Sequence, residues 1–226
     1  MAIVNGKEYL QPLEVEYGVG METSAPLLGE PLPVELMNTI WADREGVHDA
    51  LDGAAGTAAW LRSIAPRIDL TTANDLDTLS VAEIDRLARR LVALRDALRR
   101  LAAEATGDPR LPAASATREL DDAVNALNHA AGAVPRWSAL AWAPGGTPER
   151  RTRTNGQAAA AAVSAIAEEA IGLFSQDERL RLRACMAPGC VLYFLKDHPR
   201  REWCSATCGN RARGARHYQR HHSSAV

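Results

Sequence analysis

Arg183-Ala184-Cys185-Met186-Ala187-Pro188-Gly189-Cys190 and, thirteen residues further on, Trp203-Cys204-Ser205-Ala206-Thr207-Cys208-Gly209-Asn210-Arg211 are the stretches that decide how this chain is interpreted. They contain all four cysteines of the 226-residue protein, in two close pairs. Pro-Gly between the first two cysteines predicts a tight turn that lets both sulfurs face one ion. Four thiolates suit a single tetrahedral Zn²⁺. The predicted zinc ligands are Cys185, Cys190, Cys204 and Cys208.

Other uses of these cysteines are less favoured by the sequence. Disulfides are rare in a reducing compartment, where paired cysteines more often bind metal, and a redox or iron–sulfur role remains as a third use. His198 could replace one cysteine as a ligand, although a histidine in a Pro-containing turn is typically exposed. A site filled by four thiolates has no open coordination position. We therefore expect a structural zinc ion and no enzymatic activity.

The residues around the cysteines predict a small α/β module. Val191–Leu195 has the composition of a strand, Lys196–Pro199 of a turn and Arg200–Trp203 of a return strand. Asn210–Arg220 can form a helix, which places Cys208 at a helix start, where unpaired N–H groups favour a thiolate. A turn with two ligands, a hairpin and a ligand at a helix start is the layout of a treble-clef zinc finger.

Charge is distributed unevenly along the chain. Residues 179–222 contain ten Lys/Arg and two acidic residues, whereas the rest contains 16 basic and 26 acidic residues, and the net charge is −2. A basic module on an acidic body is the pattern expected when one end meets nucleic acid. Asn210 can either read a base or make a structural hydrogen bond. The candidate nucleic-acid contacts are Arg200, Arg201, Asn210, Arg211, Arg213 and Arg216.

The body is predicted to be mainly helical. Ser80–Glu104 begins with a capping box, because Ser80 is followed three residues later by Glu83. Its leucines recur at spacings of three and four, which fits the central helix of a bundle and leaves open a coiled-coil dimer seam. Further helices are predicted over Ser115–Ala131 and Gln157–Phe174.

Short β elements are also predicted. Arg136–Trp142 and Glu149–Thr154 form a plausible hairpin, and the arginines of its second strand are either a solvated edge or a supporting nucleic-acid contact. Pro33–Trp41 can be a strand that runs into a helix, or a helix throughout. Asn5-Gly6 predicts a hairpin turn near the N-terminus.

Several protein classes are not indicated. The N-terminus lacks the charged and apolar regions of a signal peptide, and no window reaches the roughly 18 continuous apolar residues of a membrane span. These observations favour a cytoplasmic protein without membrane contact. The sequence has no Gly-rich phosphate loop, no nucleophile elbow and no His/carboxylate cluster with metal-ligand spacing.

The second cysteine pair carries a family resemblance. Cys204-x3-Cys208-Gly209-Asn210-Arg211, preceded by a Cys-x4-Cys pair, resembles the signature of the CGNR zinc-finger family. That resemblance implies a treble clef and a DNA-binding element. The family usually carries an N-terminal ABATE domain, a mainly helical bacterial domain of proposed stress-responsive transcription regulators. Leu36–Thr39 and Ala59–Leu61 are similar to segments of that domain.

Together these features predict a mainly α (α+β) protein in three parts. Residues 1–30 are an N-terminal extension, 31–176 an ABATE-like helical domain with a small β-hairpin element, and 177–226 a Cys₄ treble-clef zinc finger. The expected function is a bacterial transcription regulator that binds DNA through the finger. The helical domain is expected to bind a small-molecule or protein effector or to form a homodimer. The alternatives are a zinc-stabilised protein–protein interaction module and an RNA-binding protein.

Overall fold

The computed structural model describes residues 25–68, 73–110 and 115–222. Its helices, including two short 3₁₀ helices, are α1 (Leu32–Met37), α2 (Gly53–Ile64), η1 (Ala65–Arg67), α3 (Ala73–Asp77), α4 (Val81–Thr106), α5 (Leu120–Gly132), α6 (Ala158–Ser175), η3 (Asp177–Arg181) and α7 (Ala206–His222). Three two-stranded antiparallel sheets pair β1 (Ile40–Ala42) with β2 (Val47–Asp49), β3 (Arg136–Ala141) with β4 (Glu149–Thr154), and β5 (Leu182–Ala184) with β6 (Tyr193–Leu195). The predicted fold class, mainly helical with small β-hairpins, is confirmed.

Helix α4 is the centre of the fold. The predicted capping box is present, since the Ser80 hydroxyl accepts from the Glu83 N–H and the Glu83 carboxylate accepts from the Ser80 N–H. Gly107 ends the helix with φ 63°, a left-handed conformation that glycine adopts without a Cβ clash. Leu87, Leu91, Leu94 and Leu98 of α4 are buried, and Leu101 is partly buried, in the core that α4 forms with α1, α2, α5 and α6. They belong to the protein's own core and are not available as a dimer seam.

Helix α6 packs closely because its first turns are built from alanine. Ala159–Ala162 are buried, and the helix contacts α1, α4 and α5. Among the helices of the described residues, α6 is also the only one that is long enough and apolar enough to cross a membrane, and its mean hydropathy is 1.4. Since 56% of this window is buried inside the protein, α6 has the character of a core helix.

Two helix predictions needed correction. Pro33–Trp41 is neither a strand followed by a helix nor a continuous helix, because α1 ends before Asn38 and β1 follows. The Asn38 side chain turns away to bond β6 and ends the helical run. The helix expected from Ser115 begins only at Leu120. Ser115 donates instead to the Asp96 carbonyl of α4, and residues 115–119 are not helical. The predicted Asn5-Gly6 turn lies outside the described residues.

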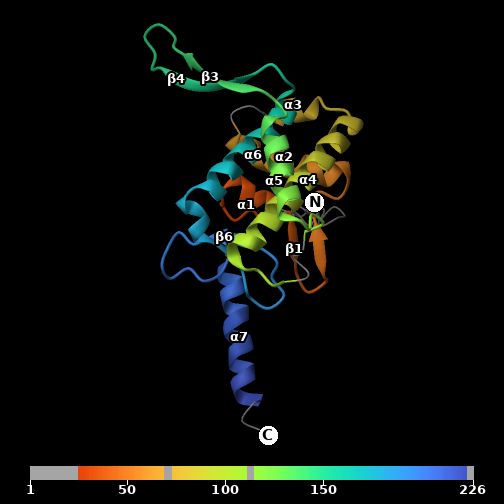
Figure 1. The fold of residues 1–226 in the computed structure, drawn as a ribbon, viewed down its shortest axis with the longest axis vertical. Coiled ribbons are helices and arrows are strands. Elements are labelled where there is room, and N and C mark those ends of the chain that lie inside the picture. Colours follow the sequence, from red (N-terminus) through yellow and green to blue (C-terminus); the bar gives the residue numbers. More distant parts are fainter. Residues whose placement is uncertain (1–24, 69–72, 111–114, 223–226) are drawn as a thin grey trace, which may run out of the picture.

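The β3–β4 hairpin, hereafter the arm, forms as predicted. Its register places Trp137 opposite Arg153 and Leu140 opposite Arg150. Trp137, Leu140 and Trp142 are at least half exposed. Figure 1 shows the arm extending from one end of the molecule and α7 extending from the other. The arginines of the arm therefore do not share a surface with α7.

The finger and the helical domain share one hydrophobic core. Strand β6 is buried throughout and belongs to the same cluster as α1 and α4. On one side β6 pairs with β5. On the other, the Asn38 side chain accepts from the Tyr193 N–H at 2.8 Å and donates to the Tyr193 carbonyl at 2.9 Å. The Leu195 N–H donates to the Glu30 carboxylate at 2.9 Å.

This arrangement explains why one predicted strand is absent. Arg200–Trp203 was expected to pair with Val191–Leu195, but it forms turns and bends. The edge of β6 that it would occupy is already hydrogen-bonded to Asn38 and Glu30. The prediction of a return strand was wrong, because it treated the finger as a hairpin on its own. Glu30, assigned to an N-terminal extension, is buried in this contact.

We expect Asn38→Ala to lower the free energy of unfolding by about 2–4 kcal/mol, since it leaves the buried Tyr193 N–H and carbonyl without partners. Urea denaturation followed by circular dichroism, at fixed zinc concentration, measures the change. Asn125→Ala, at an exposed position of α5, is the matched control and should change stability by less than about 0.5 kcal/mol. Equal effects of the two variants would show that Asn38 does not complete the edge of β6.

Candidate zinc centre and basic helix

The first cysteine pair lies at the tip of the β5–β6 hairpin. The Cys185 N–H donates to the Leu192 carbonyl at 2.9 Å, which closes the hairpin. Within the loop the Cys190 N–H donates to the Ala187 carbonyl at 2.9 Å. Gly189 has φ +72°, the conformation that the third position of a type II turn requires. The predicted Pro-Gly turn is thus present, and it brings the two cysteines together.

The second pair joins a loop to the start of α7. Ser205 caps the helix, because its hydroxyl accepts from the Cys208 N–H at 3.2 Å and its carbonyl accepts from the Gly209 N–H at 3.1 Å. Cys204 precedes the cap, and Cys208 lies in the first turn. The two sulfurs are 3.5 Å apart. The start of α7 therefore fixes the position of Cys208, whereas Cys204 lies on the loop before the helix.

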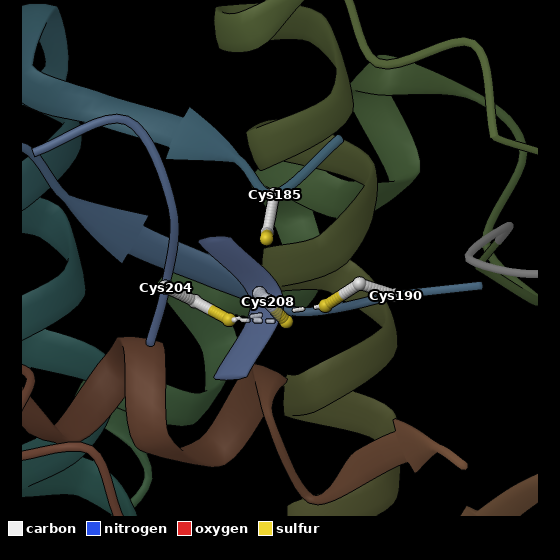
Figure 2. Close-up of side chains that lie close together, drawn as sticks. All are labelled: Cys185, Cys190, Cys204 and Cys208. Atoms are coloured by element: carbon white, nitrogen blue, oxygen red, sulfur yellow. Dashed lines mark hydrogen bonds between the residues drawn. The ribbon is translucent and has the colours of Figure 1, made fainter. Parts of the chain in front are cut away.

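The four sulfur atoms converge, as Figure 2 shows. They all lie within 4.8 Å of one another, all four residues are buried, and none is in a disulfide. Tetrahedral Zn²⁺ with bonds of about 2.3 Å requires sulfur atoms about 3.8 Å apart. The distances of 3.8 Å from Cys190 to Cys204 and 3.5 Å from Cys204 to Cys208 fit that requirement. The cluster is a site for one structural zinc ion.

The electrostatics of the cluster favour a cation. Hydrogen bonding with the sulfurs of Cys185 and Cys190 raises the pKa of the Cys204 thiol. The Cys190 pKa is likewise raised, to about 12, first by its hydrogen bond with Cys185. Several thiolates cannot be close together in a buried site without a compensating positive charge. A dication at the centre of the cluster supplies that charge.

Arg211 adds a contact to the sulfur of a ligand. Its guanidinium donates to the Cys208 sulfur at 3.1 Å. This hydrogen bond is the main reason that the pKa of Arg211 is raised. Hydrogen bonds to ligand atoms orient the ligand and offset the negative charge of a thiolate site. Arg211 thus belongs to the zinc centre, at least in part.

Arg110, from the helical domain, reaches into the first cysteine loop. Its guanidinium donates to the carbonyls of Cys185 at 2.8 Å and Cys190 at 3.1 Å. Two further bonds, of 2.7 and 2.6 Å, join it to the Asp108 carboxylate. The Tyr193 hydroxyl also donates to Asp108, at 2.7 Å. Burial opposes ionisation of Asp108, but these hydrogen bonds hold its pKa below the ordinary value.

Arg201 connects the second cysteine loop to the body. Its guanidinium donates to the buried Glu30 carboxylate at 2.5 Å, to the Leu195 carbonyl at 3.0 Å and to the Cys204 carbonyl at 3.2 Å. It also lies over the Phe194 ring, 5.0 Å from the centroid. These contacts direct Arg201 towards the interior. Arg201 was predicted to contact nucleic acid, but its guanidinium already makes these internal hydrogen bonds.

The remaining candidates lie on or beside α7. Arg213 donates to the Asn210 side-chain oxygen, and the Arg216 guanidinium lies 5.5 Å from the centroid of the Trp203 ring. A Cβ on Gly209 would lie 3.1 Å from the Trp203 ring, so glycine lets the indole pack against the helix. Arg200 is exposed, and its side chain makes no hydrogen bond or ion pair with any described residue. Asn210, Arg213 and Arg216 are also exposed.

An open groove of about 450 Å³ runs beside the start of α7. Arg200, Arg201 and Arg213 contribute guanidinium groups to its walls, which also include Glu202, Trp203 and Ser205. The N-terminus of α7 is adjacent, and helix N-termini favour anions. The groove combines guanidinium groups and a helix N-terminus, which are the groups that bind phosphates.

The cysteine ligands and the helix after Cys208 were identified from the sequence, whereas Arg110, Asp108, Asn38 and Glu30 were not. No local pattern marks these four residues, because each contacts a segment at least 75 residues away in the chain. His198 is exposed and lies outside the sulfur cluster, as expected for a turn histidine. The Arg183 guanidinium donates to the carbonyls of Leu180 in η3 and Leu182 in β5.

Two family models match the chain. The ABATE model, described as "putative stress-induced transcription regulator", matches residues 30–177, which is more than half of the protein. The CGNR zinc-finger model matches residues 181–221. No curated protein matches the sequence. The matched ranges correspond to the helical domain and to the segment that contains the four cysteines.

We expect the purified protein to hold one zinc ion and to unfold in a single transition whose midpoint falls when a chelator removes the ion. The single transition follows from the core that finger and helical domain share. Elemental analysis and scanning calorimetry with and without chelator provide the measurements. Two separate transitions, with only the smaller one sensitive to chelator, would contradict this coupling. Zinc affinity should fall as the pH is lowered, since protons compete for the thiolates.

We expect Arg110→Met to cost about 3–5 kcal/mol, since it leaves the buried Asp108 carboxylate without its cation. The Asp108 and Arg110 side chains are 1% and 10% exposed, so water cannot replace the pair. Arg110→Met combined with Asp108→Asn should recover part of the loss, because no buried charge is then unpaired. A double-mutant cycle from urea denaturation tests this. Additive effects of the two substitutions would contradict the pairing.

Proposed function

Because the chain belongs to the ABATE family and carries a CGNR zinc finger, we propose that it is a transcription regulator that binds DNA through α7. The helical domain, residues 31–176, receives the signal or mediates dimerisation. The observation that carries the proposal is the projecting basic helix that the zinc centre holds at its base. We place the protein in a bacterial cytoplasm, where thiols stay reduced.

Helix α7 has the dimensions and charge of a DNA-contacting element. It spans 17 residues, or about 25 Å at 1.5 Å per residue, and it extends away from the body (Figure 1). It contains four arginines and no acidic residue. A helix of this kind fits the major groove, which is about 12 Å wide. Asn210, Arg213, His217 and Arg220 recur at spacings of three and four and so form one stripe.

The contacts at the base of α7 divide the candidate arginines into two groups. Arg201 and Arg211 are bonded to Glu30 and to the Cys208 sulfur, so their main task is to hold the helix in place. Arg200, Arg213 and Arg216 are exposed, and Arg200 and Arg213 line the groove. We assign phosphate or base-edge contacts to these three residues. Asn210 accepts a hydrogen bond from Arg213, which supports a positioning role.

Zinc supplies structure and no reaction in this proposal. The four thiolates occupy all tetrahedral positions, which leaves none for a substrate or a reactive water. We therefore propose that the protein has no enzymatic activity of its own. The metal orients α7 relative to the body, and the arginines on the exposed side of the helix interact with DNA.

We expect Arg213→Ala with Arg216→Ala to weaken binding to random-sequence DNA and to reduce the slope of log K against log salt by about 2, since each phosphate contact contributes about 0.9. Fluorescence anisotropy at several salt concentrations measures both quantities. Arg150→Ala with Arg151→Ala is the matched control. It removes the same charge from the arm, at the opposite end of the molecule (Figure 1).

An unchanged slope in the α7 variant would show that this face does not contact DNA. Equal losses in both variants would point to attraction by net charge alone. Binding of the wild type to the acidic polypeptide polyglutamate, without binding to DNA, would favour the alternative of a protein interaction module. Circular dichroism and zinc content confirm that both variants are folded.

A further inference from the structure

We propose that the groove between α4, α5 and α6, at the base of the arm, binds a small organic anion that has an apolar part. The inference names a site and a ligand class for the sensing role proposed above, and it rests on that role. The groove has two connected parts, a wide mouth of about 580 Å³ and a narrow slot of about 150 Å³. Arg90, Ala93 and Ala160 line both parts.

The mouth is positively charged. Arg86, Arg89 and Arg90 line it from α4. All three are exposed, and none makes a hydrogen bond or an ion pair with a residue in the described part of the chain. Unpaired guanidinium groups bind carboxylates, sulfonates and phosphates, often through two parallel hydrogen bonds. Three such groups around one cavity favour an anionic ligand.

Glu83 is the one acidic residue among the described residues that line the mouth, and it does not neutralise the arginines. Glu83 accepts from the Ser80 N–H and hydroxyl on one oxygen and from Gln157 at 3.0 Å on the other. These bonds, the Ser80 hydroxyl first, lower the pKa of Glu83, so it stays ionised. Its carboxylate joins the start of α4 to the start of α6 and lies beside the arginines as part of the wall. Three positive groups against one negative group leave the mouth with a positive charge.

The slot is mainly apolar. Leu94 and Val163 line it, together with alanines of α4, α5 and α6, and Arg90 and His129 contribute polar side chains to its wall. Ser164 lies there as well, but its hydroxyl donates to the Ala130 carbonyl at 2.8 Å and is not available to a ligand. The buried alanines of α6 pack closely on one side, whereas on the side of Ala160 the three helices leave a slot of about 150 Å³. The slot can take a short hydrocarbon or aromatic group, which burial stabilises by about 25 cal/mol per Å².

Charge at the mouth and apolar walls in the slot together define the ligand class. An anionic head group would bond Arg86 or Arg90, and an attached apolar group would enter beneath Ala160. Ligand sites in proteins commonly have this composition, a mostly apolar cavity with a few convergent polar groups. The groove also contacts Val134 and Gln157, which flank the arm in sequence. A ligand there would tie α4 to the segments that support the arm.

The test uses the full-length zinc-loaded protein with sodium octanoate and sodium benzoate as probes. Acetate supplies the charge without the apolar part, and octanamide supplies the apolar part without the charge. We expect octanoate or benzoate to raise the unfolding midpoint in a saturable way, because a ligand that binds the native state stabilises it. Acetate and octanamide should bind at least tenfold more weakly. Isothermal titration calorimetry gives the affinities.

Two variants locate the site. Arg86→Gln with Arg90→Gln removes the positive head-group contacts, and Ala160→Leu fills the slot. Each should weaken octanoate binding at least tenfold. Arg44→Gln removes an exposed arginine from the β1–β2 turn and should leave binding unchanged. Zinc content and circular dichroism establish that Ala160→Leu is folded. If it does not fold, Ala160→Val is used, with a smaller expected loss.

Absence of saturable binding by both probes would overturn the proposal, as would binding that is equal in the wild type and in both groove variants. The DNA-binding proposal is tested separately by the Arg213→Ala/Arg216→Ala variant, which should bind octanoate normally. Loss of DNA binding in that variant with octanoate binding retained supports both proposals. If the wild type binds octanoate but not DNA, the proposal of a ligand site stands and the proposal of a DNA-binding regulator is rejected.

Discussion

The burial of Tyr193 is the constraint on which the rest of the structure depends. Two guanidinium groups lie over its ring, those of Arg99 at 5.3 Å and Arg110 at 5.1 Å from the ring centroid. Burial of an arginine is costly unless its donors are paired. Arg99 meets this requirement by donating to the Met37 carbonyl of the body and the Val191 carbonyl of the finger. Separation of finger and body would break these hydrogen bonds and expose the apolar core that the two parts share, so the finger is an integral part of the fold.

The physical roles of the CGNR residues follow from this packing. Cys208 is a ligand in the first turn of α7, and Gly209 is the position against which the Trp203 indole packs. Asn210 and Arg211 diverge, since Asn210 bonds the outward Arg213 while Arg211 turns back to the Cys208 sulfur. One residue of the motif binds metal, one permits close packing, one orients an exposed arginine and one stabilises a thiolate. The motif therefore supplies a zinc ligand and also fixes the position of the first turns of α7.

Local features were predicted from the sequence, and contacts between distant segments were not. The sulfur cluster, the capping box at Ser80 and the arm each depend on residues close in sequence, whose spacing and turn chemistry are visible there. The prediction of a return strand was wrong because the Asn38 side chain, 155 residues away, makes the hydrogen bonds to Tyr193 that a neighbouring strand would otherwise make. An alternating pattern cannot show that an edge is already occupied. Arg201 illustrates the same limit, since charge alone suggested a surface role and its contact with Glu30 is internal.

Helix α4 connects the groove to the finger. Arg90 lines the groove, and Arg99, nine residues or about 14 Å further along the helix, bonds both Met37 and Val191. The residues between them, Leu91, Leu94 and Leu98, are almost completely buried, so this part of α4 can shift only as a unit. A ligand changes DNA affinity only if it binds two arrangements of the protein with different affinity. A shift of α4 would alter the Arg99 hydrogen bonds to the Met37 and Val191 carbonyls, which lie on the two sides of the boundary. If the proposed ligand acts on the finger, no hinge between domains is required, since Arg99 already joins α4 to Val191, the residue after the zinc ligand Cys190.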